Sequence, residues 1–237
     1  MANNDETRLA VLIDSDNTTA SLTAELLAEI AKYGTPTVKR AYGDWTTQQL
    51  AGWKDQLLRH AIQPIQQFAY TKGKNATDSA LIIDAMDILY AGNVEGFVIV
   101  SSDSDFTRLA TRLRESGHTV YGIGARKTPA PFVSACDRFI YLDLFAPEKP
   151  SEPAARTPRT PSAKKVLAAA INSTSKDDGW ANLGEVGSYL SRSDAAFDSR
   201  DYGYTKLGDL VRAEDYVEVK TISTANGQNR LMVRLKP

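Results

Sequence analysis

The 237-residue chain has 42% apolar residues and a net charge of −1, which is typical of a globular protein with one main core and room for a second, small domain. No run approaches the roughly 18 consecutive apolar residues of a membrane span, and the opening MANNDETR lacks the layout of a signal peptide. The single cysteine, Cys136, excludes an internal disulfide and a cysteine-rich zinc site. We therefore expect a cytoplasmic protein that does not associate with membranes.

The first part of the chain alternates between strand-like and helix-like segments. Apolar runs typical of strands occur at 9–13, 37–42, 62–68, 96–102, 119–124 and 138–143. Helical spacing occurs at 20–33, 46–60, 77–91, 105–115 and 131–136. Buried strands separated by helices form a parallel sheet that is covered on both faces. This pattern predicts an α/β domain whose ligand site lies beyond the carboxyl ends of its strands.

Acidic residues occur where that rule predicts a site. Asp14 and Asp16 follow the run LAVLI, and Asp103 and Asp105 follow GFVIV. Asp78 stands at the start of the predicted helix 77–91. We therefore expect three distant segments to bring carboxylates to one edge of the sheet.

Each of these acids also has a simpler interpretation, because Asp often serves only as an N-cap where a helix begins. Asp84 and Asp87 lie on other faces of their helix than Asp78, at about 100° per residue, so we expect them to be structural or solvent-exposed charges. Crowded carboxylates raise one another's pKa values, and a bound divalent ion removes that cost. Oxygen ligands suit Mg²⁺ or Mn²⁺ rather than zinc, and His60 and His118 fall away from the predicted site.

The segments LIDSDN, KGKNATD and VIVSSDSDF, in this order, resemble the NYN domain, a PIN-like (Rossmann-type) nuclease fold related to the LabA-like proteins. The resemblance covers about residues 7–145, and its strongest motif runs from Ser101 to Phe106, with Ser102 where the family usually has glycine. It implies a ribonuclease that depends on Mg²⁺ or Mn²⁺. The implied catalytic and metal-binding residues are Asp14, Asp78, Asp103 and Asp105, assisted by Asn17 and Asp16.

Other polar residues near these acids are candidate contacts to RNA. Phosphodiester hydrolysis by bound metal ions needs no side-chain nucleophile, but it does need groups that hold the substrate phosphates. The predicted phosphate-binding or RNA-binding residues are Lys72, Lys74, Thr77, Ser101 and Ser102. Tyr70 and Trp45 are candidate platforms for base stacking, although an aromatic residue at a strand end more often serves packing.

A proline-rich segment divides the chain. Residues 147–165 hold five of the ten prolines, and carry five Lys and Arg residues against two Asp and Glu residues. Such a composition is typical of an extended linker. We predict a domain at 1–146, a flexible linker at 147–162 and a second domain at 163–237.

Three helical segments followed by two strand-like runs in the last 75 residues predict a small α+β winged-helix domain. This region resembles the OST-HTH, or LOTUS, domain through Asp178-Gly179-Trp180, Phe197-Asp198, Arg200, Tyr202-Gly203 and Leu207. The resemblance implies binding of single-stranded or structured RNA, or docking to a protein partner. Trp180, Phe197 and Leu210 are expected in the core.

Two other functions remain open. The motif from Asp14 to Thr18 also fits the opening of haloacid-dehalogenase-type phosphatases, in which the first Asp is the nucleophile, but the downstream Gly-Asp-x-x-x-Asp element is missing. A nuclease fold kept only as an RNA-binding or protein-binding module is the other alternative. A homodimer is compatible with each of them.

Overall fold

The computed structural model describes residues 7–68, 76–145, 162–223 and 229–236. The chain divides into two compact units, residues 1–146 and 147–237, and each is considered by itself. The predicted linker lies outside the described residues except for Ser162, which is the N-cap of the helix that follows it. Lys72, Lys74 and Tyr70 also lie outside the described residues.

Six parallel strands form the sheet of the first unit, in the order β3-β2-β1-β4-β5-β6. They are β1 (Arg8–Asp14), β2 (Thr35–Gly43), β3 (Gln63–Gln66), β4 (Gly96–Val100), β5 (Thr119–Gly124) and β6 (Arg138–Tyr141). The predicted parallel α/β fold is confirmed. The direction in which strands are added reverses between β1 and β4, and the carboxyl edge at such a switch point is where α/β sheets bind ligands.

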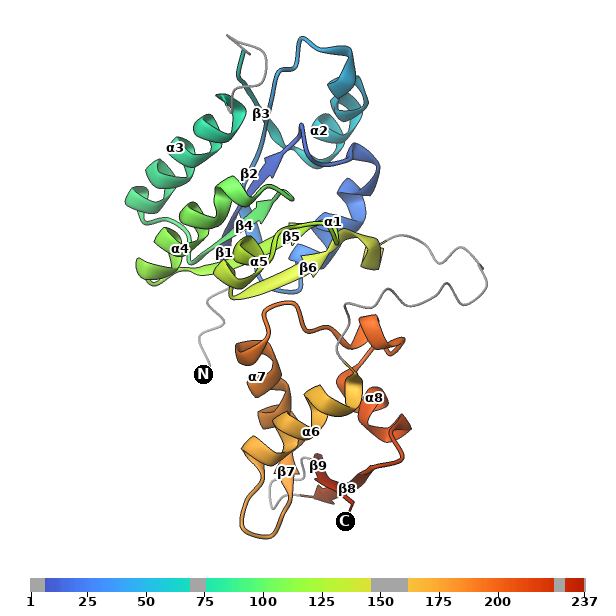
Figure 1. Ribbon diagram of the computed structural model, residues 1–237. Coiled ribbons are helices and arrows are strands. Elements are labelled where there is room, and N and C mark those ends of the chain that lie inside the picture. Colours follow the sequence, from blue (N-terminus) through green and yellow to red (C-terminus); the bar gives the residue numbers. More distant parts are fainter. Residues whose placement is uncertain (1–6, 69–75, 146–161, 224–228, 237) are drawn as a thin grey trace. The chain divides into compact units, whose positions relative to one another are not determined.

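Helices cover both faces of this sheet (Figure 1). Helices α1 (Thr23–Ile30) and α2 (Lys54–His60) pack on one face, where their apolar residues join the alternate residues Leu9, Val11 and Ile13 of β1 in one core cluster. The other face carries α3 (Ala76–Ala91), α4 (Thr107–Glu115) and α5 (Ala130–Ala135).

Three predicted helices, 20–33, 46–60 and 105–115, begin in 3-10 turns, the last of them in Ser104–Phe106. The first two turns are η1 (Ala20–Leu22) and η2 (Gln48–Trp53), and each follows an extended threonine, Thr19 or Thr47. Threonine with extended backbone is a common N-cap, but neither of these side chains makes the cap hydrogen bond that would support the first turn. The helices proper are therefore shorter than their periodicity predicts.

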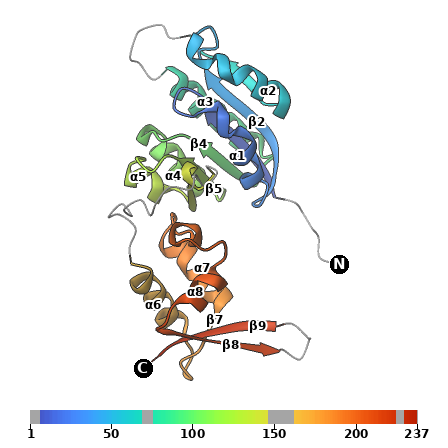
Figure 2. The same ribbon diagram turned by 90° about the vertical axis from the view of Figure 1, so that its right-hand side faces the viewer.

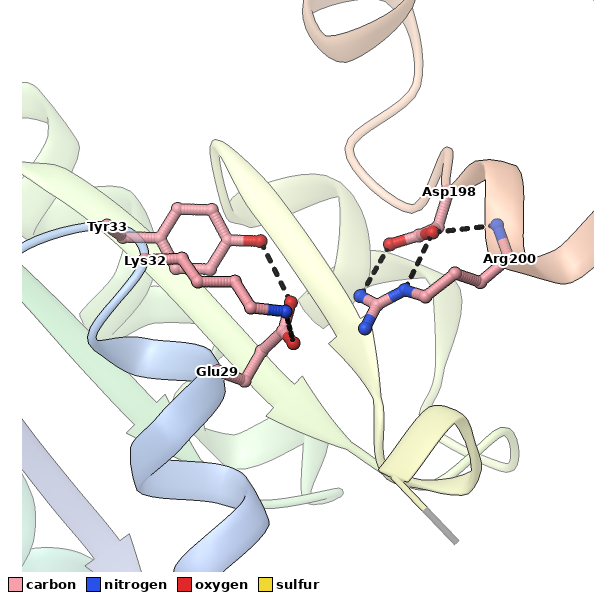
Figure 3. Close-up of polar contacts among 5 residues, drawn as sticks. All are labelled: Glu29, Lys32, Tyr33, Asp198 and Arg200. Atoms are coloured by element: carbon pink, nitrogen blue, oxygen red, sulfur yellow. Dashed lines mark hydrogen bonds and ion pairs between the residues drawn. The ribbon is translucent and has the colours of Figure 1, made fainter. Parts of the chain in front are cut away.

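Two acidic side chains of the first unit, Glu29 and Asp84, form structural contacts away from the predicted site. Glu29, 5% exposed, accepts hydrogen bonds from Lys32 Nζ at 2.6 Å and from Tyr33 Oη at 3.2 Å (Figure 3). Asp84 on α3 pairs with Arg40 and accepts a hydrogen bond from the Tyr42 hydroxyl, both on β2. Asp84 therefore has the structural role expected of it.

The second unit contains three helices and a three-stranded antiparallel sheet in the order β7-β9-β8. Its elements are α6 (Ala163–Thr174), β7 (Ala181–Asn182), α7 (Leu183–Ser193), the 3-10 turn η5 (Ser199–Tyr202), α8 (Leu207–Ala213), β8 (Val217–Ser223) and β9 (Asn229–Leu235). Strands β8 and β9 form a long hairpin beside the helices (Figure 2). The winged-helix layout is confirmed, whereas the two-residue strand β7 was not predicted.

The residues that carry the resemblance of this unit are largely structural. Asp198 caps η5 through the Arg200 backbone N–H at 2.9 Å, and its carboxylate also accepts from Arg200 Nε at 3.0 Å and Nη2 at 2.8 Å (Figure 3). Gly203 ends the turn with φ +86°, a conformation that favours glycine. Trp180 is buried, and its ring is covered by the Lys220 ammonium at 3.6 Å and the Arg234 guanidinium at 4.7 Å.

None of the helices that the structure describes combines the length and the apolar character needed to span a bilayer.

Candidate metal centre

Three carboxylates meet at the carboxyl edge of the first unit's sheet. One oxygen from each of Asp78, Asp103 and Asp105 lies within 4.8 Å of the others. Asp78 stands in the first turn of α3, and the other two follow β4. The structure therefore brings together three of the four predicted ligands, from two segments distant in sequence.

The turn after β4 holds Asp103 and Asp105 in place. Asp103 is the N-cap of the 3-10 turn η3 (Ser104–Phe106), and its Oδ1 accepts a hydrogen bond from the Asp105 backbone N–H at 2.9 Å. Phe106 is fully buried and packs against Phe132 of α5. The phenylalanine of the Ser-Asp-Ser-Asp-Phe element therefore anchors the turn that carries the acids.

Asp14, at the end of β1, lies outside that group of three and is fully buried. Its Oδ2 accepts hydrogen bonds from Ser101 Oγ at 2.7 Å and from Asn17 Nδ2 at 2.8 Å. Its Oδ1 has no hydrogen-bond partner among the described residues. Ser101 Oγ also accepts the Asp103 backbone N–H at 3.1 Å, so this hydroxyl connects the ends of β1 and β4.

The charged forms of Asp78 and Asp14 are disfavoured by their surroundings. Burial, and next the charges of Asp14, Asp103, Asp105 and Asp16, raise the pKa of Asp78 to about 6. Burial also raises the pKa of Asp14, and the hydrogen bonds from its neighbours oppose that shift. A cation at this edge would relieve the repulsion.

The side chains present fit a divalent cation. Their donors are all carboxylate oxygens, which suit Mg²⁺ or Mn²⁺, and the buried Asp14 Oδ1 offers an acceptor that nothing in the described chain satisfies.

The remaining predicted residues have varied surroundings. Asp16 Oδ2 accepts a hydrogen bond from Thr77 Oγ1 at 3.0 Å, which joins the β1 end to the start of α3. Ser102 Oγ accepts the Ala125 backbone N–H at 2.8 Å. Trp45 Nε1 donates to the Ile65 carbonyl at 3.0 Å, so this indole takes part in packing beside β3.

Sequence reasoning missed the structural part played by Ser101 and the contact between Asp16 and Thr77. The serine-rich stretch VSSDSD gave one usable signal for the first, since a small hydroxyl beside buried acids commonly bonds to them. The second joins residues 61 positions apart and had no sequence signal.

Comparison with known families identifies both units. The model of the NYN domain matches residues 8–143, and that of the OST-HTH/LOTUS domain matches residues 158–228. Both resemblances seen in the sequence are thereby confirmed. No curated protein matches the chain.

Solved structures with similar chains include proteins of Vibrio parahaemolyticus, Nitrosomonas europaea and Chromobacterium violaceum. One is the crystal structure of a protein of unknown function from Vibrio parahaemolyticus, whose sequence is 17% identical to this one. The match covers 60% of this chain and 96% of that chain, with a TM-score of 0.51. That likeness concerns the fold alone. A solution NMR structure of an uncharacterised protein from Nitrosomonas europaea is 37% identical over 38% of this chain and 90% of its own, with a TM-score of 0.31. Another solution NMR structure, of a protein from Chromobacterium violaceum, is 28% identical in sequence. The match covers 34% of this chain and 87% of that chain, with a TM-score of 0.28.

We predict different effects on stability when two buried serines are replaced, Ser15 after β1 and Ser101 after β4. Ser101→Ala removes hydrogen bonds to Asp14 and Asp103, and should lower the free energy of unfolding by about 1–3 kcal/mol. Ser15→Ala removes a hydroxyl without a partner among the described residues. This change should leave the free energy of unfolding the same or raise it slightly. Urea denaturation of the full-length variants measures both. Equal destabilisation by the two changes would contradict the connecting role of Ser101.

We also predict a pH-dependent gain in stability from Asp78→Asn in metal-free protein. The pKa of Asp78 is higher in the folded state than in the unfolded chain, so this carboxyl destabilises the fold increasingly as pH rises from about 4 through 6. After allowance for its partial exposure and for the lost favourable charge at the start of α3, the variant should be more stable by about 1 kcal/mol, or roughly 2–4 °C, at pH 8.

The melting temperatures of both proteins in EDTA, from pH 4 to pH 8, test this. Asp87→Asn, on the exposed side of the same helix, is the matched control. The difference should shrink toward pH 4, and added Mg²⁺ or Mn²⁺ should stabilise the wild type more than Asp78→Asn. A variant that melts below the wild type at pH 8 would contradict the repulsion at this site.

Proposed function

Since this chain belongs to the NYN domain family, we propose that it is a metal-dependent ribonuclease that hydrolyses RNA phosphodiester bonds. Members of this family are ribonucleases, and their nuclease domains are typically dependent on divalent metal ions. The observation that carries the proposal is the cluster of Asp78, Asp103 and Asp105 at the switch point of the sheet. The buried carboxylate of Asp14 stands at the end of the neighbouring strand β1.

In this proposal, Asp14, Asp78, Asp103 and Asp105 hold Mg²⁺ or Mn²⁺. When bound, such an ion supplies a nucleophilic water at neutral pH and stabilises the charge that develops on the phosphoryl group. Asn17 and Ser101 orient the Asp14 carboxylate through their hydrogen bonds to Oδ2. Asp16 assists from the rim, where it accepts the Thr77 hydroxyl.

Contacts to the substrate phosphates come from the surroundings of the acids. Lys72, Lys74 and Thr77 lie before or at the start of α3, whose first backbone N–H groups favour an anion. Ser102 accepts a hydrogen bond from the Ala125 backbone N–H. In this proposal it also keeps its predicted contact with a substrate phosphate. The Ser101 hydroxyl already donates to Asp14 and accepts the Asp103 backbone N–H, so we assign it to positioning Asp14 in place of the predicted contact with RNA.

The second unit is proposed to bind the same RNA. An OST-HTH/LOTUS domain suggests RNA binding. The unit carries 9 Lys and Arg residues against 10 Asp and Glu residues over 166–237, which favours selective recognition over nonspecific attraction to phosphate. Docking to a protein partner, a homodimer and the cytoplasmic location remain predictions.

We predict that Asp103→Asn abolishes RNA cleavage while the fold is kept. Asparagine is also a favourable N-cap, so the turn after β4 should persist. The rate should fall by more than about 100-fold, since even residues that only orient a metal ligand are worth roughly 10- to 100-fold. Labelled single-stranded RNA incubated with Mn²⁺, Mg²⁺ or EDTA measures the rate, and Asp87→Asn is the control expected to retain full activity.

Cleavage that persists in EDTA, or at the wild-type rate in Asp103→Asn, would refute the assignment. A wild-type protein that binds RNA but never cleaves it would favour the non-enzymatic binding module.

We predict that the two units divide the work between cleavage and affinity. The fragment 1–146 should cleave short oligonucleotides in the presence of metal but bind long RNA more weakly than the full chain, because a tethered binding unit raises the local RNA concentration. The fragment 163–237 should bind RNA without cleaving it. Affinities of the three proteins for one RNA, measured at a stated salt concentration, test this. If the fragment 163–237 binds no RNA, and the full chain binds it no better than 1–146, the second unit docks another protein.

A further inference from the structure

A recess of about 490 Å³ opens at the carboxyl edge of the first unit's sheet, between the end of β1 and the turn η2. Its polar and aromatic lining includes Ser15, Asp16, Ser21, Gln49, Trp53 and Gln56, and we call it the Ser15 recess. A volume of this size lies within the roughly 300–1,000 Å³ of small-molecule sites. Nothing in the proposed metal centre accounts for it.

The recess has a rigid base. Trp53 and Leu50 are 3% and 4% exposed and belong to the core cluster beneath α1 and α2. At the end of β2, Gly43 provides the space for Leu50, because a Cβ at this position would come within 2.5 Å of Leu50 Cδ1. The base of the recess is therefore set by packed residues.

The polar groups of the recess suit an uncharged ligand. Ser15 is 2% exposed, and its hydroxyl has no hydrogen-bond partner among the described residues. The amides of Gln49 and Gln56 each offer donors and an acceptor. No Lys, Arg or His is among the described residues that line the recess, and Asp16 adds a negative charge, so the lining disfavours a phosphate.

Asp16 joins this recess to the metal centre. Its side chain lines the recess, and its Oδ2 accepts the hydroxyl of Thr77, the residue before Asp78. If an RNA strand places one phosphate at the acid cluster, the recess therefore lies beside the nucleotide next to that phosphate. Proteins read single-stranded RNA by the hydrogen-bonding edges and faces of unstacked bases.

We propose that the Ser15 recess is a subsite for one nucleobase of the RNA, beside the scissile phosphate, and that it gives cleavage a base preference. The proposal rests on the proposed function, which it deepens by assigning where the substrate is read. Hydrogen bonds to Gln49, Gln56 and Ser15 discriminate between bases, because a wrong base leaves these groups without partners.

Binding of the four ribonucleosides to the full-length protein in EDTA tests the subsite without any cleavage. Isothermal calorimetry should find that one nucleoside binds more tightly than the others, and that free ribose and orthophosphate do not compete. Gln49→Ala and Ser15→Ala should each weaken that binding about fivefold, the loss of roughly one hydrogen bond. Gln48→Ala is the matched control, since Gln48 is an exposed neighbour in η2 outside the recess, and it should have no effect.

Cleavage of an RNA pool with randomised positions provides the second measurement. The wild type and Gln48→Ala should share a preference at one position next to the cut, and Gln49→Ala should reduce it about fivefold. Nucleoside binding with the expected variant pattern in a protein that does not cleave would support the subsite and refute the nuclease. The subsite is overturned if no nucleoside binds, if ribose competes as well as the nucleosides do, or if Gln49→Ala and Gln48→Ala behave alike.

Discussion

Burial of the Asp14 carboxylate at the end of β1 is the constraint on which the rest of the first unit depends. An ionised group out of water is unfavourable unless hydrogen bonds or a counter-charge compensate for it. Ser101 and Asn17 satisfy one oxygen, and the other is left without a partner in the described chain. Among the described residues this carboxylate is thus only half satisfied, and the cation of the proposed function would supply the missing partner.

The topology of the sheet explains why the acids come from different segments of the chain. A parallel sheet delivers the carboxyl ends of all its strands to one edge, and the switch point leaves the ends of β1 and β4 side by side with helices on opposite faces. Carboxylates placed there are close in space and distant along the chain. Their repulsion destabilises the empty fold, and strain of this kind is common at functional sites.

Much of this could be predicted from the sequence, because the relevant signals are local. The runs LAVLI and GFVIV are buried strands, and the acids that follow them were correctly expected at the carboxyl edge. The 3-10 starts of three helices and the strand β7 were missed, since segments of two to six residues carry too little periodicity. The Ser15 recess was missed for another reason: its lining comes from the segment after β1 and from η2 and α2, whose approach depends on packing around Gly43 and Leu50.

The serine at position 102 has a mechanical consequence. Where the family motif usually has glycine, this chain has a side chain whose Oγ accepts the Ala125 backbone N–H, and so ties the turn after β4 to the end of β5. The residue adopts no positive φ, and therefore gains this bond without backbone strain. A glycine there would leave the turn with more conformational freedom in the unfolded chain and one fewer restraint in the folded one. The loop that carries Asp103 and Asp105 is thus tied to β5, on the side of β4 opposite to β1, which restrains the backbone on which both carboxylates stand.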